Sequence, residues 1–359
     1  MSNVSSDDAS FASDLLTYSK SGIEYSGASS LKIKGPAEVH SSFLAFLAVA
    51  QTLNFDFLPI TWQPELDVVG QGATARIWQA LVNLQMTFAF KRPRTQLGKE
   101  AEMLRALTAE ISILGHPSIR DHPAVVKIEG ICWDLLEGGE VVMPVLVFEK
   151  TKHGDLKKFI TEGVGSTLSF HEKLELCFDI GLAIRDMHVA GVIHGDIKPQ
   201  NILVFESESG NYAAKVTDFG YSTIFNNEDD IIRLPRSQYW TAPEWHHRGF
   251  TTSEAKSMDT YSFGMVCLWL LFYDSRLDKD LVFNQDVFKV YQERLSSVSR
   301  RCMMEKTEKE AGSIWKFFQL TLANDPGERT HDFEGLLHLL VPLRYVKSNM
   351  TSFSTADNQ

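Results

Sequence analysis

The sequence has few cysteines, no long apolar run and no excess of positive charge, and each absence excludes a class of protein. Its 359 residues include only four cysteines, and no two of them form a CxxC pair. A disulfide framework or a cysteine zinc site is therefore not expected, and we predict reduced thiols, as in a cytoplasmic or nuclear protein. The net charge of −11 disfavours nucleic acid or an anionic membrane surface as the main partner.

Two apolar stretches, residues 43–50 and 261–272, are shorter than the roughly 20 residues that a helix needs to cross a bilayer. We therefore expect no membrane span and place both stretches in the core of a soluble protein. The first 30 residues are rich in Ser and Asp and do not resemble a signal peptide. The chain is long enough for two lobes, each with its own core.

Residues 1–60 are predicted to form an N-terminal extension with one helix. Residues 1–36 are rich in Ser, Gly and Ala without any period, which is typical of a mobile segment. From Ser41 to Asn54, apolar residues recur with helical spacing, which predicts an amphipathic helix packed on the following lobe. These residues are Leu44, Phe46, Leu47, Val49 and Leu53. The alternative is a regulatory helix that binds a partner. Residues 346–359 are predicted to be a flexible tail.

The main concentration of reactive side chains lies in residues 192–203, which read VIHGDIKPQNIL. Between two apolar runs stand Asp196, then Lys198 two residues later and Asn201 five residues after the aspartate. A carboxylate can accept a hydroxyl proton, an ammonium can stabilise a transferred phosphoryl group, and an amide oxygen can hold magnesium. This spacing therefore indicates phosphoryl transfer.

This segment resembles the catalytic loop of eukaryotic protein kinases, H-R-D-x-x-x-x-N, except that Gly195 stands in place of the arginine. The resemblance extends from about Trp62 to Leu343, with the family motifs in order. It implies an α+β, two-lobed protein-kinase fold: a β-rich N-lobe with one long helix at residues 61–149, and a mainly helical C-lobe at residues 150–345. It also implies ATP and Mg²⁺ as cofactors and a protein as substrate.

The first motif by resemblance is the glycine-rich turn in residues 66–78, LDVVGQGATARIW, where Ala75 replaces the third glycine. Glycines let backbone amides approach phosphate oxygens, although Gly70 and Gly72 would also suit a plain hairpin turn. Residues 88–91, FAFK, resemble the V-A-I-K strand, which implies that Ala89 lies against adenine and that Lys91 binds the α- and β-phosphates.

Residues 99–114 have an amphipathic helix pattern with Met103, Leu107, Ile111 and Leu114 on one stripe. Glu110 borders this apolar stripe, so we assign it as the family's helix glutamate, which fixes Lys91. Two His-Pro pairs follow within residues 115–126 and suggest a short loop insertion. Metal binding by these histidines is the weaker alternative.

Residues 145–148 form an apolar strand that leads into a polar joint. The resemblance implies that backbone groups of Glu149 and Thr151 bind adenine and that Phe148 is the gatekeeper. It adds Val69, Ile77 and Leu203 to the nucleotide site. Farther along, residues 171–188 predict a core helix, and Gly191 is suited to end it.

Asp218 belongs to a D-F-G motif and, by resemblance, binds magnesium together with Asn201 and the phosphates of ATP.

Residues 221–241 would form the activation segment, closed by Ala-Pro-Glu at residues 242–244. Asp259 opens an apolar helix that would anchor the catalytic loop. Arg329, in a D-P-x-x-R pattern, would form a salt bridge with Glu244.

Lys198 favours Ser/Thr specificity, although Trp240-Thr241 and residues 259–264 resemble the tyrosine-kinase-like branch. A pseudokinase that binds ATP without turnover is one alternative, motivated by Ala75 and Gly195. A small-molecule phosphotransferase is another, because His-Gly-Asp is common there. The Ala-Pro-Glu motif and the long activation segment favour a protein substrate.

Gly195 leads to a hypothesis about regulation. The arginine that it replaces normally pairs with a phosphorylated activation segment. We therefore expect activity to be largely independent of phosphate there. The candidate hydroxyls would be at most modulatory: Ser222, Thr223, Ser237 and Thr241.

Overall fold

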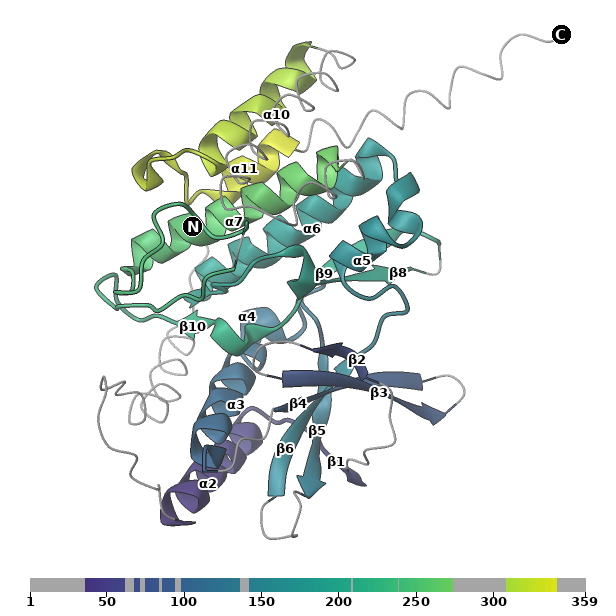
Figure 1. Ribbon diagram of the computed structural model, residues 1–359, viewed down its shortest axis with the longest axis vertical. Coiled ribbons are helices and arrows are strands. Elements are labelled where there is room, and N and C mark those ends of the chain that lie inside the picture. Colours follow the sequence, from purple (N-terminus) through teal and green to yellow (C-terminus); the bar gives the residue numbers. More distant parts are fainter. Residues whose placement is uncertain are drawn as a thin grey trace, which may run out of the picture. The chain divides into compact units, whose positions relative to one another are not determined.

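The computed structural model describes residues 36–61, 68–71, 75–83, 86–93, 98–135, 142–207, 209–237, 239–273 and 308–340 (Figure 1). The chain divides into two compact units. The first contains residues 1–121 and 126–150, and the second contains residues 122–125 and 151–359. Residues 1–35, the tail at 346–359 and Gly72 lie outside the described residues, so the predictions made for them stay predictions.

A six-stranded sheet forms the framework of the first unit, with the strand order β1-β5-β6-β4-β3-β2. Its strands are β1 (Phe57–Thr61), β2 (Val68–Gln71), β3 (Ala75–Asn83), β4 (Met86–Pro93), β5 (Ile128–Leu135) and β6 (Val142–Glu149). Most neighbours are antiparallel, but β1 runs parallel to β5. The side chains of β6 are buried from Met143 to Phe148, which suits its place inside the sheet. The strand predicted at residues 88–91 is confirmed as part of β4.

Among the described residues, this sheet is accompanied by the helices α2 (Pro36–Thr52), α3 (Glu100–Leu114) and the short α4 (Pro117–Arg120). The helices predicted at residues 41–54 and 99–114 are confirmed. The apolar stripe predicted for the second was wrong in one member, because Leu104 is fully buried whereas Met103 is only half-buried. The reason is that α3 packs against both α2 and β6, so more than one of its faces is covered.

The predicted loop insertion at residues 115–126 contains α4, and both histidines there have structural partners. His116 caps α4, because its Nδ1 accepts the backbone N–H of Ser118 at 3.3 Å. In the second unit, His122 Nε2 lies 2.9 Å from Asp186 Oδ2, and its Nδ1 accepts the N–H of Ala124 at 3.1 Å. These contacts explain the two histidines without a metal.

The second unit is mainly helical. Its longer helices are α5 (Leu156–Thr161), α6 (Phe170–Val189), α7 (Thr252–Phe272), α10 (Glu308–Thr321) and α11 (Phe333–Leu340). Its strands form two small antiparallel pairs, β7 (Val192–Ile193) with β10 (Thr223–Ile224), and β8 (Ile202–Glu206) with β9 (Tyr212–Val216). Short 3-10 turns lie at Val164–Thr167, Pro199–Asn201, Phe219–Tyr221 and Pro326–Glu328. This sequence of a β-rich unit and a helical unit confirms the predicted fold class.

The two central helices of the second unit begin with capping boxes. Ser169 and Glu172 cap α6, and Thr251 and Glu254 cap α7, so the first backbone N–H groups are satisfied by side chains. The chain leaves α6 through Gly191, whose φ of +74° is accessible to glycine at low cost, as predicted. Helix α7 is buried along nearly its whole length and forms the centre of this unit's core.

Within the described ranges, no helix combines the length and apolar character that a membrane crossing requires. The cysteines at 132, 177 and 267 are buried as free thiols, and Cys302 lies outside the described residues. Burial, with a smaller contribution from the charge of Asp134, raises the pKa of the Cys132 thiol to about 12. That thiol is therefore protonated at neutral pH and has a core role.

Candidate active site

The residues 192–203 form a loop between β7 and β8 that is held by one buried carboxylate. Asp259, on α7, accepts the backbone N–H groups of His194 and Gly195, each at 2.9 Å. Its side chain is almost completely buried, and His188 Nε2 on α6 lies 3.1 Å from its Oδ2. The predicted anchoring of this loop by α7 is therefore present, and its physical basis is a pair of charge-assisted hydrogen bonds.

Gly195 adopts a φ of +79°, in the left-handed region that other residues rarely adopt. The position that a Cβ would take lies only 2.8 Å from Leu234 Cδ2. Leu234 is buried, so an apolar side chain of the segment after β10 covers the loop at this point. The positive φ therefore favours glycine at residue 195, and a Cβ there would also have to displace the end of the Leu234 side chain.

Two predicted residues, Lys198 and Asn201, converge on the Asp196 carboxylate. Lys198 Nζ donates to Asp196 Oδ2 at 2.6 Å, and Asn201 Nδ2 donates to the same oxygen at 3.0 Å. Asn201 Nδ2 also donates to the backbone oxygen of Asp196 at 2.9 Å, which fixes the amide plane. Asp196 is buried at 4% exposure, so this carboxylate acts in a medium where charge interactions are stronger than in water.

Ser237 completes this group, and its place could not be predicted from the sequence. Its Oγ donates a short hydrogen bond to Asp196 Oδ1 and accepts one from Lys198 Nζ at 3.2 Å. Thr241 holds it there, because Thr241 Oγ1 accepts the Ser237 N–H at 2.7 Å and donates to the Ser237 carbonyl at 2.8 Å. An aliphatic hydroxyl therefore lies against the carboxylate and the ammonium together, and the prediction that Ser237 is at most a modulatory phosphorylation site stays a prediction.

The two predicted metal ligands lie just beyond the same end of the β8–β9 ladder, where Ile202 pairs with Val216. Thr217 N donates to the backbone oxygen of Asn201 at 3.0 Å, which brings Asp218 close to Asn201. Asp218 has a φ of +64°, and the ring of the next residue, Phe219, is buried and lies 5.4 Å from the His194 ring. Burial raises the pKa of the Tyr221 phenol, and the charges of Asp196 and Asp218 raise it further.

The donor set of Asn201 and Asp218 fits a hard cation. Because the Asn201 side-chain nitrogen donates to Asp196, its side-chain oxygen is left to act as a ligand. Amide and carboxylate oxygens are the protein ligands that magnesium prefers, and magnesium usually keeps several water or phosphate ligands as well. The described residues contain no cluster of three or more His, Cys, Asp or Glu that could hold a metal alone. Because Asn201 and Asp218 supply only part of a magnesium coordination shell, a metal here would take its other ligands from water or from a group such as nucleotide phosphate.

In the first unit, the predicted ion pair between Lys91 and Glu110 is present. Lys91 Nζ on β4 lies 2.5 Å from Glu110 Oε1 on α3, and both residues are buried. Lys91 is paired in the sheet with Leu146, and Ala89, two residues earlier, is paired with Phe148. The alternation of side chains along β4 places Ala89 and Lys91 on the same face of the sheet, as expected.

The structure places the other predicted nucleotide-binding residues only in part. Val69 and Gly70 lie on β2, Ala75 and Ile77 lie on β3, and Gly70 is paired with Ile77. Gly72 lies between these strands, outside the described residues.

The remaining residues predicted to bind the nucleotide lie at the ends of strands or next to them. Glu149 ends β6 and donates its N–H to Lys127 O at 3.0 Å. Thr151 Oγ1 donates to Val204 O on β8, and Leu203 is the residue before Val204 on that strand. Their roles in nucleotide binding stay predictions.

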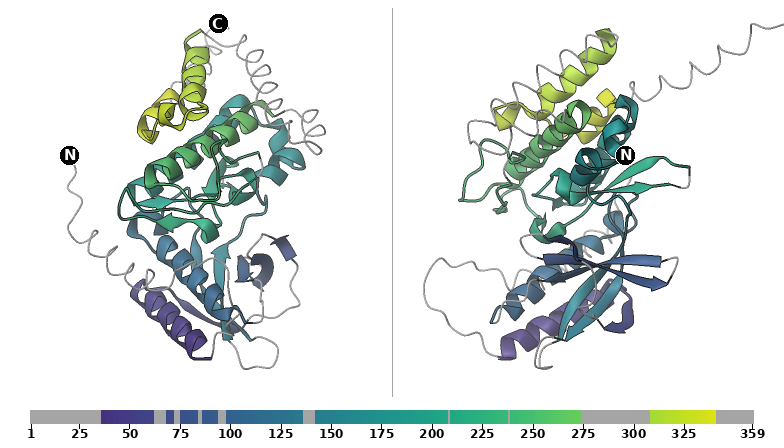
Figure 2. Two further views of the ribbon diagram at one scale, coloured as in Figure 1. Left: turned by 60° about the vertical axis from the view of Figure 1, so that its left-hand side comes forward. Right: turned by 45° about the vertical axis from the view of Figure 1, so that its right-hand side comes forward.

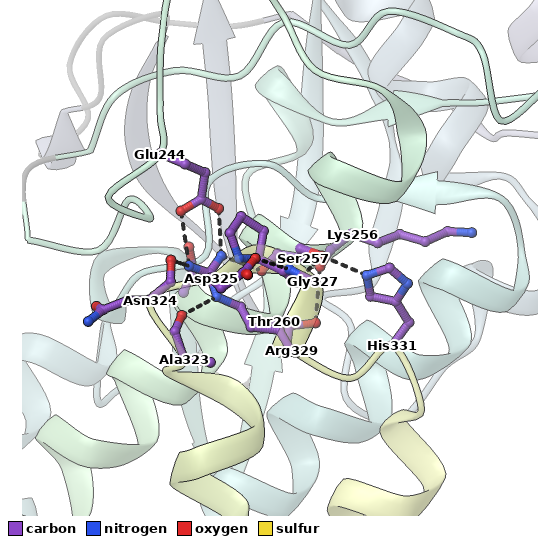
Figure 3. Close-up of polar contacts among 12 residues, drawn as sticks. Glu244, Lys256, Ser257, Thr260, Ala323, Asn324, Asp325, Gly327, Arg329 and His331 are labelled. Carbon is purple, nitrogen blue, oxygen red and sulfur yellow. Dashed lines mark hydrogen bonds and ion pairs between the residues drawn. The ribbon is translucent and has the colours of Figure 1, made fainter.

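The predicted salt bridge between Arg329 and Glu244 is present and bidentate (Figure 3). Arg329 Nη1 and Nη2 donate to the two Glu244 oxygens at 2.5 and 2.9 Å, and Nε donates to Ala323 O at 2.8 Å. The guanidinium carbon also lies 4.7 Å from the centre of the Tyr261 ring. This pair joins the end of residues 221–244 to the core of the second unit.

Comparison with known proteins adds independent evidence. Residues 64–339 match the family model described as the protein kinase domain. A "Probable LRR receptor-like serine/threonine-protein kinase" of Arabidopsis thaliana is 30% identical over 60% of this chain and 19% of its own length. A "Probable serine/threonine-protein kinase" of Dictyostelium discoideum is 31% identical over 56% of this chain and 36% of its own length. A second "Probable serine/threonine-protein kinase", from Arabidopsis thaliana, is 28% identical over 59% of this chain and 46% of its own length. The chain thus spans less than half the length of each relative.

Proposed function

Since the chain belongs to the protein kinase family, we propose that it transfers the γ-phosphoryl group of ATP to serine or threonine hydroxyls of a protein substrate. The observation that carries the proposal is the Asp196 carboxylate, which accepts a hydrogen bond from an aliphatic hydroxyl while Lys198 contacts both. This is the arrangement that a hydroxyl about to attack a phosphoryl group requires.

In the proposed reaction, Asp196 orients the acceptor hydroxyl and takes its proton. Lys198 stabilises the negative charge that develops on the transferred phosphoryl group. Asn201 donates to Asp196 and keeps the carboxylate in one orientation. Since these groups are held before the substrate arrives, catalysis would come mainly from positioning and from fixed charges.

Lys91 would position the ATP phosphates, and Glu110 would hold Lys91. A buried ion pair adds little net stability, because desolvation offsets the attraction between its charges. Its presence is therefore better explained by binding a charged ligand than by folding. Asn201 and Asp218 would hold magnesium, which in this family neutralises charge on the β- and γ-phosphates.

The position of Ser237 supports an aliphatic hydroxyl, rather than a phenol, as the group of the substrate that accepts the phosphoryl group. Its hydroxyl reaches Asp196 with a single methylene between Oγ and Cα, which is the reach of a substrate serine. A tyrosine acceptor would put its hydroxyl a full ring farther from its backbone. The three relatives described above all carry serine/threonine-protein kinase in their names.

A peptide library with Ser, Thr or Tyr as the only hydroxyl tests this proposal directly. With labelled ATP and Mg²⁺, we expect label on Ser and Thr peptides and none on Tyr peptides. Label on Tyr alone would contradict the proposed specificity. The absence of label on every peptide, together with measurable ATP binding, would favour the pseudokinase. The Asp196→Asn variant supplies the background for each peptide.

The two alternative functions have weaker support. A pseudokinase would be favoured by the loss of a charged residue of the site, but Lys91, Glu110, Asp196, Lys198 and Asp218 are all retained. A small-molecule phosphotransferase would leave the segment between Asp218 and Glu244 without a purpose. Here that segment supplies Ser237 to the site and ends in the Glu244–Arg329 pair.

We also propose that the activation segment keeps its conformation without phosphate. Leu234 packs over Gly195, and its carbonyl accepts Trp245 Nε1 at 3.0 Å. Ile232 exchanges two backbone hydrogen bonds with Phe250, at 2.7 and 2.8 Å. These apolar and backbone contacts hold the segment where an arginine–phosphate pair would act in other kinases.

Phosphatase treatment is therefore expected to leave phosphate transfer essentially unchanged. Leu234→Ala should lower activity, because a core leucine-to-alanine change removes packing worth about 2–5 kcal/mol. Ile231→Ala is the matched control, since Ile231 is in the same segment but 64% exposed. The rates of phosphate transfer before and after phosphatase treatment, measured for the wild type and both variants, check these expectations. Loss of wild-type activity on dephosphorylation of this segment would show that the proposal is wrong.

A further inference from the structure

The segment 36–61 lies before the residues that match the protein kinase domain, yet it is built into the first unit. Its helix α2 packs along α3, the helix that carries Glu110 (Figures 1 and 2). Its strand β1 pairs with β5 at the edge of the sheet that carries Lys91. This segment therefore contacts α3, which carries Glu110, and the edge of the sheet whose strand β4 carries Lys91.

The contact between α2 and α3 is a close-packed apolar face with an ion pair at one end. Phe46, Val49, Ala50 and Leu53 are buried with helical spacing, whereas Leu44 on the other side of α2 is 51% exposed. Leu53, just after α2, packs closely on Gly115, just after α3: its Cδ1 lies 2.8 Å from the position that a Cβ on Gly115 would take.

Polar contacts reinforce both ends of this face. Arg105 Nη1 on α3 donates to Glu38 Oε1 on α2 at 3.1 Å. Arg120, at the end of α4, donates to the backbone oxygens of Leu53 and Asn54, the latter at 2.9 Å. Its guanidinium also lies 5.0 Å from the centre of the Phe55 ring. The C-terminal end of α2 is therefore tied to the chain that follows α3.

The other end of the segment is fastened to the sheet. Ile131 N on β5 donates to Asp56 O at 2.8 Å, just before β1 begins. The ring of Phe57 stacks on Trp133 of β5 with centroids 5.5 Å apart. Phe43 of α2 packs on the same indole at 5.8 Å, so α2 and β1 share a contact with the sheet.

We propose that residues 36–61 are an intramolecular brace that positions α3 for catalysis. Its contacts at Arg105 and Gly115 lie five residues before and five residues after Glu110, so they restrain the helix on both sides of that residue. The brace links α3 to the sheet independently of the Lys91–Glu110 pair. With α2 docked on α3, the Lys91–Glu110 ion pair is formed at 2.5 Å. An inhibitory segment would instead separate these two residues when it docks.

This inference rests on the proposed function, because its catalytic consequence requires that Lys91 position ATP. The brace acts through Glu110 and touches no reacting group. Phe46→Ala tests it, with Leu44→Ala as a matched control two residues away on the exposed side of α2. Arg120→Met is a milder second variant, since it keeps the aliphatic stem and removes the hydrogen bonds to Leu53 and Asn54 and the charge over the Phe55 ring.

Hydrogen exchange of the full chain is the first measurement. Phe46→Ala and Arg120→Met should accelerate exchange in α3 (Glu100–Leu114) and leave α7 (Thr252–Phe272) as in the wild type. Leu44→Ala should change neither helix. Unchanged exchange in α3 in both test variants would overturn the brace, whether or not the protein transfers phosphate. Absence of transfer in the wild type would instead contradict the proposed function.

Kinetics with the best library peptide are the second measurement. Phe46→Ala and Arg120→Met should lower kcat/KM for ATP by about tenfold, equivalent to about 1.4 kcal/mol. Each should cause no further loss when combined with Glu110→Gln, because the brace and Glu110 act in one chain of contacts. Equal losses in both backgrounds would show that α2 serves folding alone and would overturn the proposal. Wild-type kinetics in both test variants would overturn it as well.

Discussion

Replacing Asp196 by asparagine is expected to abolish phosphate transfer, with a fall in kcat of about 10²–10⁴-fold. Asparagine has the same shape but cannot accept the proton of the acceptor hydroxyl. Its oxygen can keep the hydrogen bonds from Lys198 and Asn201, and its NH₂ group can donate to Ser237 Oγ. The fold should therefore persist, and ATP affinity should stay close to that of the wild type. Transfer from labelled ATP and equilibrium ATP binding are the two measurements.

Asp332→Asn is a suitable control for this change. Asp332 lies outside the catalytic loop and accepts the N–H of Gly335 at 2.9 Å at the start of α11, a bond that asparagine can keep. It should transfer phosphate like the wild type. If Asp196→Asn retained wild-type turnover, the assignment of Asp196 as the proton acceptor would have to be abandoned.

Replacing Arg329 by methionine is expected to destabilise the protein by about 3 kcal/mol, the low end of the cost of removing one partner from a buried ion pair, because Glu244 is 22% exposed. The guanidinium is buried, and its loss would leave the Glu244 carboxylate and the carbonyl of Ala323 without their donors (Figure 3). This is a large part of the roughly 5–15 kcal/mol that stabilises a typical domain. Chemical denaturation followed by tryptophan fluorescence measures the change.

Arg185→Met provides the comparison. Arg185 likewise pairs with carboxylates, Asp186 at 2.6 Å and Glu334 at 2.8 Å, but its side chain is 30% exposed. Solvent-exposed pairs of this kind contribute only about 0–1 kcal/mol. Similar losses in the two variants would mean that burial of the Arg329–Glu244 pair does not determine its contribution.

The chemistry of the catalytic loop could be predicted because its three residues lie within one short segment. The spacing of Asp196, Lys198 and Asn201 places them on a single loop, whatever the rest of the chain does. The pairing of Lys91 with Glu110, 19 residues apart, could also be predicted. Strand alternation limits the direction of Lys91, and the helical period leaves one acidic residue at the border of the apolar face.

Ser237 shows why other parts of the site could not be predicted. It lies 41 residues after Asp196 and belongs to a segment without helical or strand periodicity. Such a segment takes its path from many weak contacts, including those of Ile232 with Phe250 and of Trp245 with Leu234. No local pattern encodes that path, so the sequence suggested only that Ser237 was a hydroxyl available for modification.

The sequence by itself determined which groups are available for phosphoryl transfer, in what order, and that the chain has a β-rich part followed by a helical part. Spacing and periodicity are local properties of the chain, so they can be recognised without knowledge of the fold. Only the tertiary structure decided which contacts hold those groups in place: the hydrogen bonds from the His194 and Gly195 N–H groups to Asp259, Leu234 over Gly195, and α2 against α3. Each of these is a contact between distant segments, and its geometry depends on how whole elements pack.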